Sequence, residues 1–563
     1  MKNILLKLIL SIVISCIFNI IIYSNAQFLN RGNFNGNINI EAQTYKQDSI
    51  IEASKVPEQI QSNGYFNLNY TNGNITAGMR YEYYLNPLLG IDSKYKGQDI
   101  AFRYISYSTD FLEITAGNYY EQFGSGLIFR SYEERALGYD NAMNGARIRV
   151  YPTKGLSITG IIGKQRNFWG TSDGIIRGGD LNIQFSELFS LNTAANIFAG
   201  ASIISTFQTD KDVFLKMPEN VLAWSGRLGV IGTNYNIDAE YAYKYNNPNA
   251  TNNYNYNPGY GLIINTAYFT RGLSASLNLH KIDNMDFRSD RYAQGTQQMI
   301  SFVPPLTKQH TYRLVSMYPY ATKFNGEAGL QAEIAYKIPR NSNIGGKYGT
   351  DLTLNYSRVH SIDTTNTYIE PEVNTISGRT YDSPFLGIGD DLYFQDINLN
   401  ISRKFSQKFK GTLSFINLIY NKDILENEGI PTSGKVKANI IIVDGTYKLS
   451  DKYAIKGELQ HMWSKQDSAI TSHDVINGNW LGLMAELTIS PSWFISIYDD
   501  WNYGNDTSIK RVHYLNANVA YIRGASRFSL GYGKQRTGIL CVGGVCRQVP
   551  ASNGFYLSVS TSF

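Results

Sequence analysis

Apolar and polar residues alternate along most of this chain, and the pattern is clearest at its C-terminal end. From Asn553 to Phe563, aromatic and aliphatic residues such as Phe555 and Leu557 alternate with Tyr and Ser. Because successive side chains of a strand point to opposite faces, this segment is predicted to be a strand with one apolar and one polar face. Apolar-out, polar-in alternation is typical of transmembrane β-barrels.

The N-terminal end predicts export. Two lysines precede an apolar stretch from Leu8 to Tyr23, and a small-x-small cleavage site ends at Ala26. The stretch is shorter than the roughly 20 residues of a membrane-spanning helix. We therefore predict a secretory signal peptide over residues 1–26 and a β-barrel over residues 27–563. Lipidation of the cysteine within the stretch is less favoured, because the apolar run continues beyond it.

Period-two segments predict the fold class. We count roughly 24 candidate strands, within a range of about 20 to 26, each near the length that a tilted strand needs to cross a membrane. The clearest are Phe34–Ala42, Tyr235–Lys244 and Ala328–Ile338. The prediction is an all-β chain that forms a single large transmembrane antiparallel β-barrel.

The connections between these segments alternate in length. Short ones, such as Asn72-Gly73-Asn74 and Arg523-Gly524-Ala525, alternate with long ones, such as 122–144 and 284–325. Outer-membrane barrels have short periplasmic turns and long outer loops. We therefore expect the outer membrane of a Gram-negative bacterium, with both termini periplasmic.

That location predicts the partners. They are the outer-membrane lipid and the barrel assembly machinery, for which Phe563 is the expected terminal signal. A surface or periplasmic protein partner is a further possibility. The first predicted strand begins a few residues after the cleavage site, so we expect no N-terminal plug domain of the TonB-dependent kind. A plug for so wide a barrel would come from its own loops or from another protein.

Composition agrees with a barrel and excludes some partners. The mean hydropathy is −0.26, and the 42 tyrosines, 27 phenylalanines and 50 glycines suit aromatic girdles and tight turns. The formal net charge of +5 is spread along the chain instead of forming a basic stripe. Nucleic acid is therefore not expected as a partner.

The densest charged segment runs from Tyr119 to Tyr151. Alternation on the strand that begins near Gly145 places Arg147 and Arg149 in the lumen, where arginines need water or acidic partners. If the preceding loop folds inward, its acids form a constriction of opposed charges that biases passage by sign. A network that merely fills the lumen is an equal alternative. The candidate residues are Glu121, Arg130, Glu133, Glu134, Arg135, Asp140, Arg147 and Arg149.

Two cysteines flank a Gly-Gly pair in the segment Cys541-Val542-Gly543-Gly544-Val545-Cys546. A two-residue hairpin turn at the glycines would pair Val542 with Val545 and place Cys541 opposite Cys546. An oxidising compartment then favours a disulfide. A metal half-site is the weaker alternative because no further ligands lie nearby in the sequence. We expect this hairpin on the last outer loop.

The segment from Pro304 to Tyr320 is rich in proline and aromatic residues. This composition suits an ordered loop, and a packed outer loop is the favoured interpretation. Entry into the barrel, or display of the aromatics to a ligand, is the alternative.

Catalysis is not expected. The motif from Phe123 to Gly126 lacks the lysine of a phosphate-binding loop and the spacing of a nucleophile elbow, so its glycines more simply permit a tight turn. The histidines are scattered without metal-ligand spacing, and we predict neither a metal nor another cofactor. Hydrolysis within the barrel wall is a minor alternative. The six histidines are His280, His310, His360, His461, His473 and His513.

Three segments carry a family resemblance: Tyr119 to Asn141, Leu306 to Tyr312 and Cys541 to Gly554. On these segments the chain resembles an uncharacterised family of large outer-membrane β-barrel proteins from Bacteroidota, catalogued as a domain of unknown function. The resemblance implies the fold and location and supplies no substrate. Architecture favours a porin-like passive or gated channel for small polar solutes. The main alternative is a non-conducting scaffold that binds a surface protein or glycan.

Overall fold

The strands of this protein form one closed ring. The computed structural model describes residues 32–368, 379–427, 429–467, 476–542 and 545–563. Within them, 24 antiparallel strands form a single sheet in which each strand pairs with its sequence neighbours and the last wall strand pairs with the first. The predicted all-β barrel is thereby confirmed. The predicted signal peptide, residues 1–26, lies outside the described residues.

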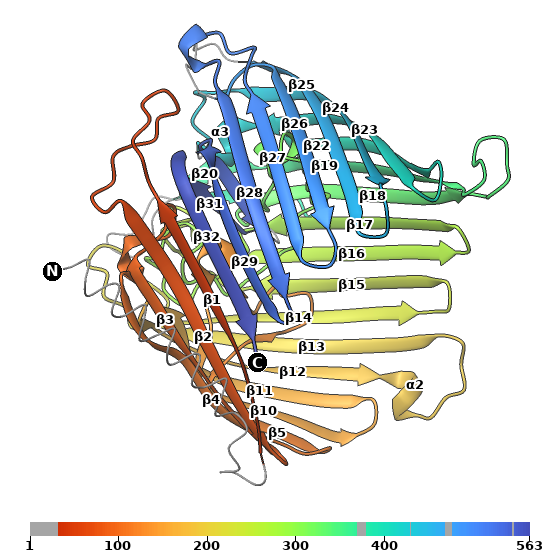
Figure 1. Ribbon diagram of the computed structural model, residues 1–563. Coiled ribbons are helices and arrows are strands. Elements are labelled where there is room, and N and C mark those ends of the chain that lie inside the picture. Colours follow the sequence, from red (N-terminus) through yellow and green to blue (C-terminus); the bar gives the residue numbers. More distant parts are fainter. Residues whose placement is uncertain (1–31, 369–378, 428, 468–475, 543–544) are drawn as a thin grey trace.

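The wall strands follow one another in chain order around the ring (Figure 1). Their numbering skips the short strands of the connections. The wall consists of β1 (Asn33–Thr44), β2 (Ile60–Asn72), β3 (Ile75–Asn86), β4 (Gly97–Ser108), β5 (Leu112–Tyr119), β10 (Met143–Thr153), β11 (Leu156–Asn167), β12 (Gly170–Gln184), β13 (Asn196–Phe207), β14 (Asn220–Ile231), β15 (Tyr235–Lys244), β16 (Gly259–Thr270), β17 (Leu273–Asp283), β18 (Gly326–Ile338), β19 (Thr350–Ile362), β22 (Ile388–Lys404), β23 (Phe409–Asn421), β24 (Lys435–Lys448), β25 (Tyr453–Gln466), β26 (Trp480–Ile489), β27 (Trp493–Trp501), β28 (His513–Arg523), β29 (Ser526–Gln535) and β32 (Ser552–Ser562).

The connections carry only short elements. They are the strands β6 (Glu121–Gln122), β7 (Arg130–Ser131), β8 (Glu133–Glu134), β9 (Tyr139–Asp140), β20 (Thr365–Tyr368), β21 (Arg379–Asp382), β30 (Gly538–Val542) and β31 (Val545–Val549), the single-turn helices η1 (Ser93–Tyr95), η2 (Arg135–Leu137), η3 (Val315–Met317) and η4 (Ser508–Lys510), and the helices α2 (Phe185–Leu188) and α3 (Lys422–Leu425). No helix among the described residues is both long and apolar enough to cross a membrane.

The strand predictions are confirmed at the three clearest positions. β15 has the predicted bounds, and β1 and β18 contain the other two predicted strands. The short turns predicted from the sequence lie at one end of the barrel, because they join alternate pairs such as β2–β3 and β28–β29. The longest connections, such as 284–325, lie at the opposite end, which we call the long-loop end. The separation is not complete, since the tight turn at 168–169 lies at the long-loop end and the connections 185–195 and 339–349 lie at the other end.

The two faces of the wall differ in chemistry. Many outward side chains are large, apolar and exposed, as are Leu228 at 60% and Leu530 at 53%, which is the surface that a bilayer covers. The inward face is polar only in part. Along β24, the inward residues Val436, Ala438 and Ile440 are at most 1% exposed. The expected polar lumen therefore holds for only part of the wall, because apolar loop residues cover the rest.

Candidate functional site in the barrel lumen

Three connections turn back from the long-loop end into the barrel. They join β5 to β10 (residues 120–142), β17 to β18 (284–325) and β29 to β32 (536–551). We call these the first, second and third inserted segments. Each contains side chains that pack against inward residues of the wall or line cavities within it.

One apolar core joins the first and second inserted segments to the wall. Phe123 and Phe129 lie with ring centroids 5.2 Å apart and are fully buried. They pack in one cluster with Ile300 of the second segment and with wall residues such as Ile176 and Ile263. Apolar residues inside a barrel are stable only when other apolar groups cover them, so this cluster ties the segments to the wall.

The glycines predicted to permit a tight turn do so. Gly124 and Gly126 have φ values of +55° and +100°, and the backbone N–H of Gly126 donates to Phe123 O at 2.9 Å. A Cβ at Gly124 would lie 2.6 Å from the carboxylate of Glu240. That carboxylate accepts a hydrogen bond from the backbone N–H of Ser125 at 2.7 Å. Glycine is needed both for the turn and for this approach.

A second apolar core contains residues of the segment from Pro304 to Tyr320 together with wall residues. The expectation for this segment was wrong. That segment does not form a packed outer loop. It enters the barrel, where the ring of Tyr320 stacks on Phe394 at 4.8 Å and the ring of Tyr318 lies 5.5 Å from that of Tyr420. The local composition could not show this entry, because the apolar partners lie on strands distant in sequence.

Four charged side chains form a cluster at the wall, which we call the quartet. Three of them, Arg147, Arg149 and Glu121, were predicted, and the fourth is Glu113. Arg147 and Arg149 point inward from β10, as expected, and both meet Glu121 of the first inserted segment, with nitrogen–oxygen distances of 3.3 and 2.5 Å. Glu113 of β5 forms an ion pair with Arg147 and lies 3.7 Å from Arg149. The four side chains are 11–26% exposed, so water reaches them, and their charges balance.

A second charged group is more deeply buried. Arg166 pairs with Glu82 at 2.8 Å and with Asp140 at 2.7 Å. Arg80 pairs with Glu82 at 2.6 Å, with Glu133 at 2.9 Å and also with Asp140. Burial by itself would raise the pKa of Asp140, but the guanidinium groups of Arg166 and Arg80 hold the pKa of that carboxyl below its usual range. The group anchors the first inserted segment to β3 and β11.

The remaining predicted charges have other partners. The guanidinium of Arg130 lies 3.8 Å from the ring centroid of Phe302, a cation–π contact to the second inserted segment. Arg135 pairs with Glu133 at 2.7 Å. Glu134 begins η2 by accepting a hydrogen bond from the backbone N–H of the second residue after it. The eight predicted residues thus divide between two charged groups and separate local contacts, and their role in a constriction stays a prediction.

Sequence reasoning missed four acidic or basic partners: Arg80, Glu82, Glu113 and Arg166. Arg80 and Glu82 are two residues apart on one strand, so their shared face was readable as a local signal. Nothing local links them to Asp140, because that contact exists only once the first inserted segment folds inward.

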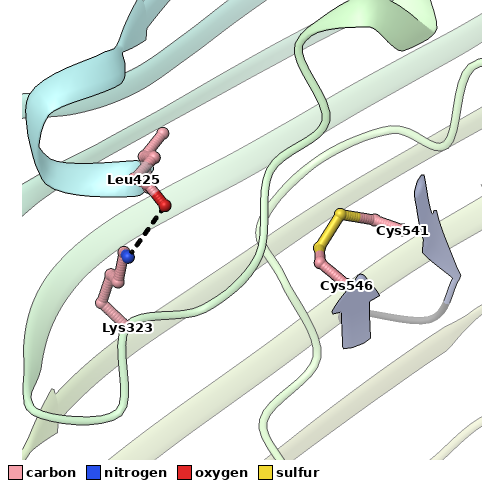
Figure 2. The surroundings of a disulfide bond; sticks show 4 residues. All are labelled: Lys323, Leu425, Cys541 and Cys546. Atoms are coloured by element: carbon pink, nitrogen blue, oxygen red, sulfur yellow. Dashed lines mark hydrogen bonds between the residues drawn. A yellow bond between two sulfur atoms is a disulfide. The ribbon is translucent and has the colours of Figure 1, made fainter. Parts of the chain in front are cut away.

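The third inserted segment carries the disulfide. Cys541 and Cys546 are bonded, with Cα atoms 4.1 Å apart, and Val542 pairs with Val545 across β30 and β31. The expected outer-loop position is wrong in one respect. The hairpin starts at the long-loop end but lies within the barrel, beside the second inserted segment that carries Lys323 (Figure 2).

Residues of this hairpin line three cavities. Leu540 and Cys541 line a cavity of about 330 Å³. Ile539 and Cys546 line a cavity of about 370 Å³, and Cys546 and Arg547 line one of about 160 Å³. The hairpin therefore borders open space at several points along its length.

The described part of the chain contains no group of three His, Cys, Asp or Glu side chains able to hold a metal. The histidines that contact acids do so singly. His280 lies 2.5 Å from Glu327 and His310 lies 2.7 Å from Asp396. His473 lies outside the described residues.

The disulfide has a direct chemical test. Purified protein comprising residues 27–563 contains only Cys541 and Cys546, so alkylation without reductant should label neither cysteine, and alkylation after reduction should label both. Intact mass spectrometry reads the result. Two labels without reductant would show that the bond is absent from the mature protein.

Solved structures similar to this one are outer-membrane proteins of low sequence identity. The siderophore receptor PirA from Pseudomonas aeruginosa matches with 10% identity and a TM-score of 0.39, over 94% of this chain and 80% of that chain. The P pilus usher PapC translocation pore matches with 11% identity and a TM-score of 0.40, over 94% and 99%. The copper transporter OprC matches with 10% identity and a TM-score of 0.40, over 95% and 83%.

Among curated proteins, none matches this sequence. A protein-family model, in contrast, matches it along its whole length, residues 1–563. The chain therefore belongs to the family of unknown function DUF6029.

Proposed function

We propose that this protein is an outer-membrane barrel whose own inserted segments close the lumen, and that it passes small polar solutes when the β30–β31 hairpin moves. The observation that carries the proposal is that residues of this hairpin line three cavities in the lumen. A channel of this kind needs a movable element beside existing space.

The chemistry of the wall supports the membrane location. A closed ring leaves no strand edge unpaired, and unpaired backbone groups within hydrocarbon cost several kcal/mol each. Many of the exposed outward residues are large and apolar, as lipid requires. With the short turns periplasmic, both termini are periplasmic and the inserted segments enter from outside.

A non-conducting scaffold is the second candidate, and specific observations favour it. Two apolar cores fix the first and second inserted segments to the wall, which opposes their movement. Several outer-loop side chains are also highly exposed and apolar, including Phe214 at 73%, Leu386 at 79% and Ile509 at 68%. Such residues suit contact with a partner at the cell surface.

Shortening the hairpin tests the gate. Gln535 pairs directly with Ser552, so replacing residues 537–550 with Asn-Gly should join β29 to β32 by a tight turn and leave the wall intact. The variant should show stable single-channel conductance steps in a planar bilayer because the hairpin no longer occupies the lumen beside the three cavities that it lines. Wild-type protein should be silent.

The control for this variant shortens another outer loop. Phe207 pairs with Asn220, and residues 209–218 between them line none of the three cavities beside the hairpin. Replacing them with Asn-Gly should leave the barrel silent. A folded, silent hairpin variant would contradict the channel and favour the scaffold, whereas steady conductance of the wild type would contradict closure at rest.

Selectivity tests the proposed role of the quartet. In the hairpin-shortened protein, Arg147→Gln with Arg149→Gln removes two positive charges and leaves Glu113 and Glu121, so the reversal potential in a KCl gradient should shift toward cation selectivity. The matched variant, Glu113→Gln with Glu121→Gln, should shift it toward anions. Unchanged potentials in both variants would place the quartet away from the conducting path.

Cysteine labelling tests location and orientation. Glu58 is exposed in the long connection between β1 and β2, and Asp110 is exposed in the short turn between β4 and β5. A membrane-impermeant maleimide should label Glu58→Cys in intact cells and Asp110→Cys only after lysis. The native disulfide does not react. The reverse pattern would contradict the proposed orientation, and no labelling of either in intact cells would contradict surface exposure.

A further inference from the structure

A separate cavity of about 520 Å³ lies at the long-loop end. Three connections that neighbour one another around the ring form it: residues 245–258 between β15 and β16, the ends of the second inserted segment, and the β20–β21 hairpin. Its volume falls within the range of about 300–1,000 Å³ that is usual for small-molecule sites.

The lining of this cavity is unusual in its chemistry. Every lining residue in the described part of the chain is polar and uncharged: six asparagines, three threonines and Tyr381. Ligand pockets are ordinarily lined mainly by apolar side chains with a few polar groups. The asparagines are Asn252, Asn253, Asn255, Asn284, Asn325 and Asn366.

Hydrogen bonds hold this lining in place before any ligand arrives. The side-chain amide of Asn252 donates to Asn284 Oδ1 at 3.0 Å, and that of Asn325 donates to the carbonyl of Thr251 at 2.7 Å. The Tyr381 hydroxyl donates to Asp283 at 2.5 Å. Asn284 is 1% exposed. A site whose walls are already ordered loses little entropy on binding.

Two of the lining amides remain available for a ligand. In the described residues, the side chains of Asn253 and Asn366 form no hydrogen bond with the protein, and both are exposed. Asn253 has a φ of +57°, a left-handed conformation that asparagine tolerates better than most residues. It lies between Asn252 and Tyr254 at a sharp bend that presents its amide at the cavity.

The geometry points to a binding site for a neutral, hydroxyl-rich ligand, and we propose that this ligand is an uncharged oligosaccharide. Each asparagine side chain offers two donors and an acceptor, and each sugar hydroxyl is both a donor and an acceptor. An anion would be bound through arginine or lysine and a cation through carboxylates. Neither kind of side chain lines the described cavity.

This inference does not rest on conduction, because a silent barrel could bind a sugar equally well. Thr251 and Asn325 also line the 370 Å³ cavity beside the disulfide hairpin. The sugar site therefore adjoins the interior space that the proposed gate borders. A ligand bound here would lie beside that space.

Calorimetric titration tests the site with the full mature chain, residues 27–563. The detergent is a sugar-free amine oxide, since alkyl glycosides would compete. The probes are glucose, mannose, galactose and N-acetylglucosamine, as monosaccharides and linear trisaccharides, with purified surface polysaccharide from the host as a separate arm. At least one neutral probe should bind, and its uronic-acid analogue should bind more weakly because, among the described residues, no basic side chain lines the cavity to pair with its charge.

The variant Asn253→Gly with Asn366→Ala removes both available amides and keeps the left-handed backbone position permissive. It should weaken binding by about tenfold or more. The matched control, Asn341→Gly, alters an exposed asparagine with a φ of +59° at the opposite end and should bind like the wild type. Binding of the monosaccharides or trisaccharides would show that the site takes free sugars. Binding of the polysaccharide alone would show that the ligand is a surface glycan. Absence of binding by every probe, or equal binding by the double variant, would overturn the proposal.

Discussion

The pairing of β1 with β32 is the contact on which the rest of the structure depends. Seven residue pairs, from Asn37 with Ser562 to Gln43 with Tyr556, close the ring. Gly36 and Phe563 extend this pairing through two backbone hydrogen bonds of 3.0 Å. Closure satisfies the edge groups of both strands, which hydrocarbon would otherwise leave without partners. Phe563 thus has a structural role in closing the ring. Its role as an assembly signal stays a prediction.

A ring of 24 strands creates a second constraint, because side chains of the wall are too short to fill it. The protein fills the space with its own connections, and two kinds of contact hold them. Apolar wall residues such as Ile440 and Trp480 are covered by apolar loop residues. Buried guanidinium groups such as Arg80 and Arg166 meet acids of the wall and of the first inserted segment. Removing one partner would leave a buried charge uncompensated, which is costly.

The three inserted segments differ in how firmly apolar contacts hold them to the wall, and this difference bears on the proposed function. The first and second inserted segments belong to the large apolar cores. The β30–β31 hairpin of the third lines three cavities and is braced internally by its disulfide. A rigid unit bordered by open space moves at less cost than one embedded in a core. For this reason we assign the role of gate to the hairpin in the proposed channel, and the amide-lined cavity is the proposed sugar site beside it.

The sequence by itself determined the strands, their alternating faces and the sidedness of the connections. Period-two alternation is local, and for that reason the bounds of β15 and the inward direction of Arg147 were predictable. The hairpin register of Cys541 and Cys546 was also local, since the two residues lie only five positions apart in the sequence. Only the tertiary structure decided where the loops go. The contacts of Asp140 with Arg80, and of Tyr320 with Phe394, join residues that have two wall strands between them in the sequence. Such contacts depend on ring closure and on inward folding of the long loops, which no local pattern encodes.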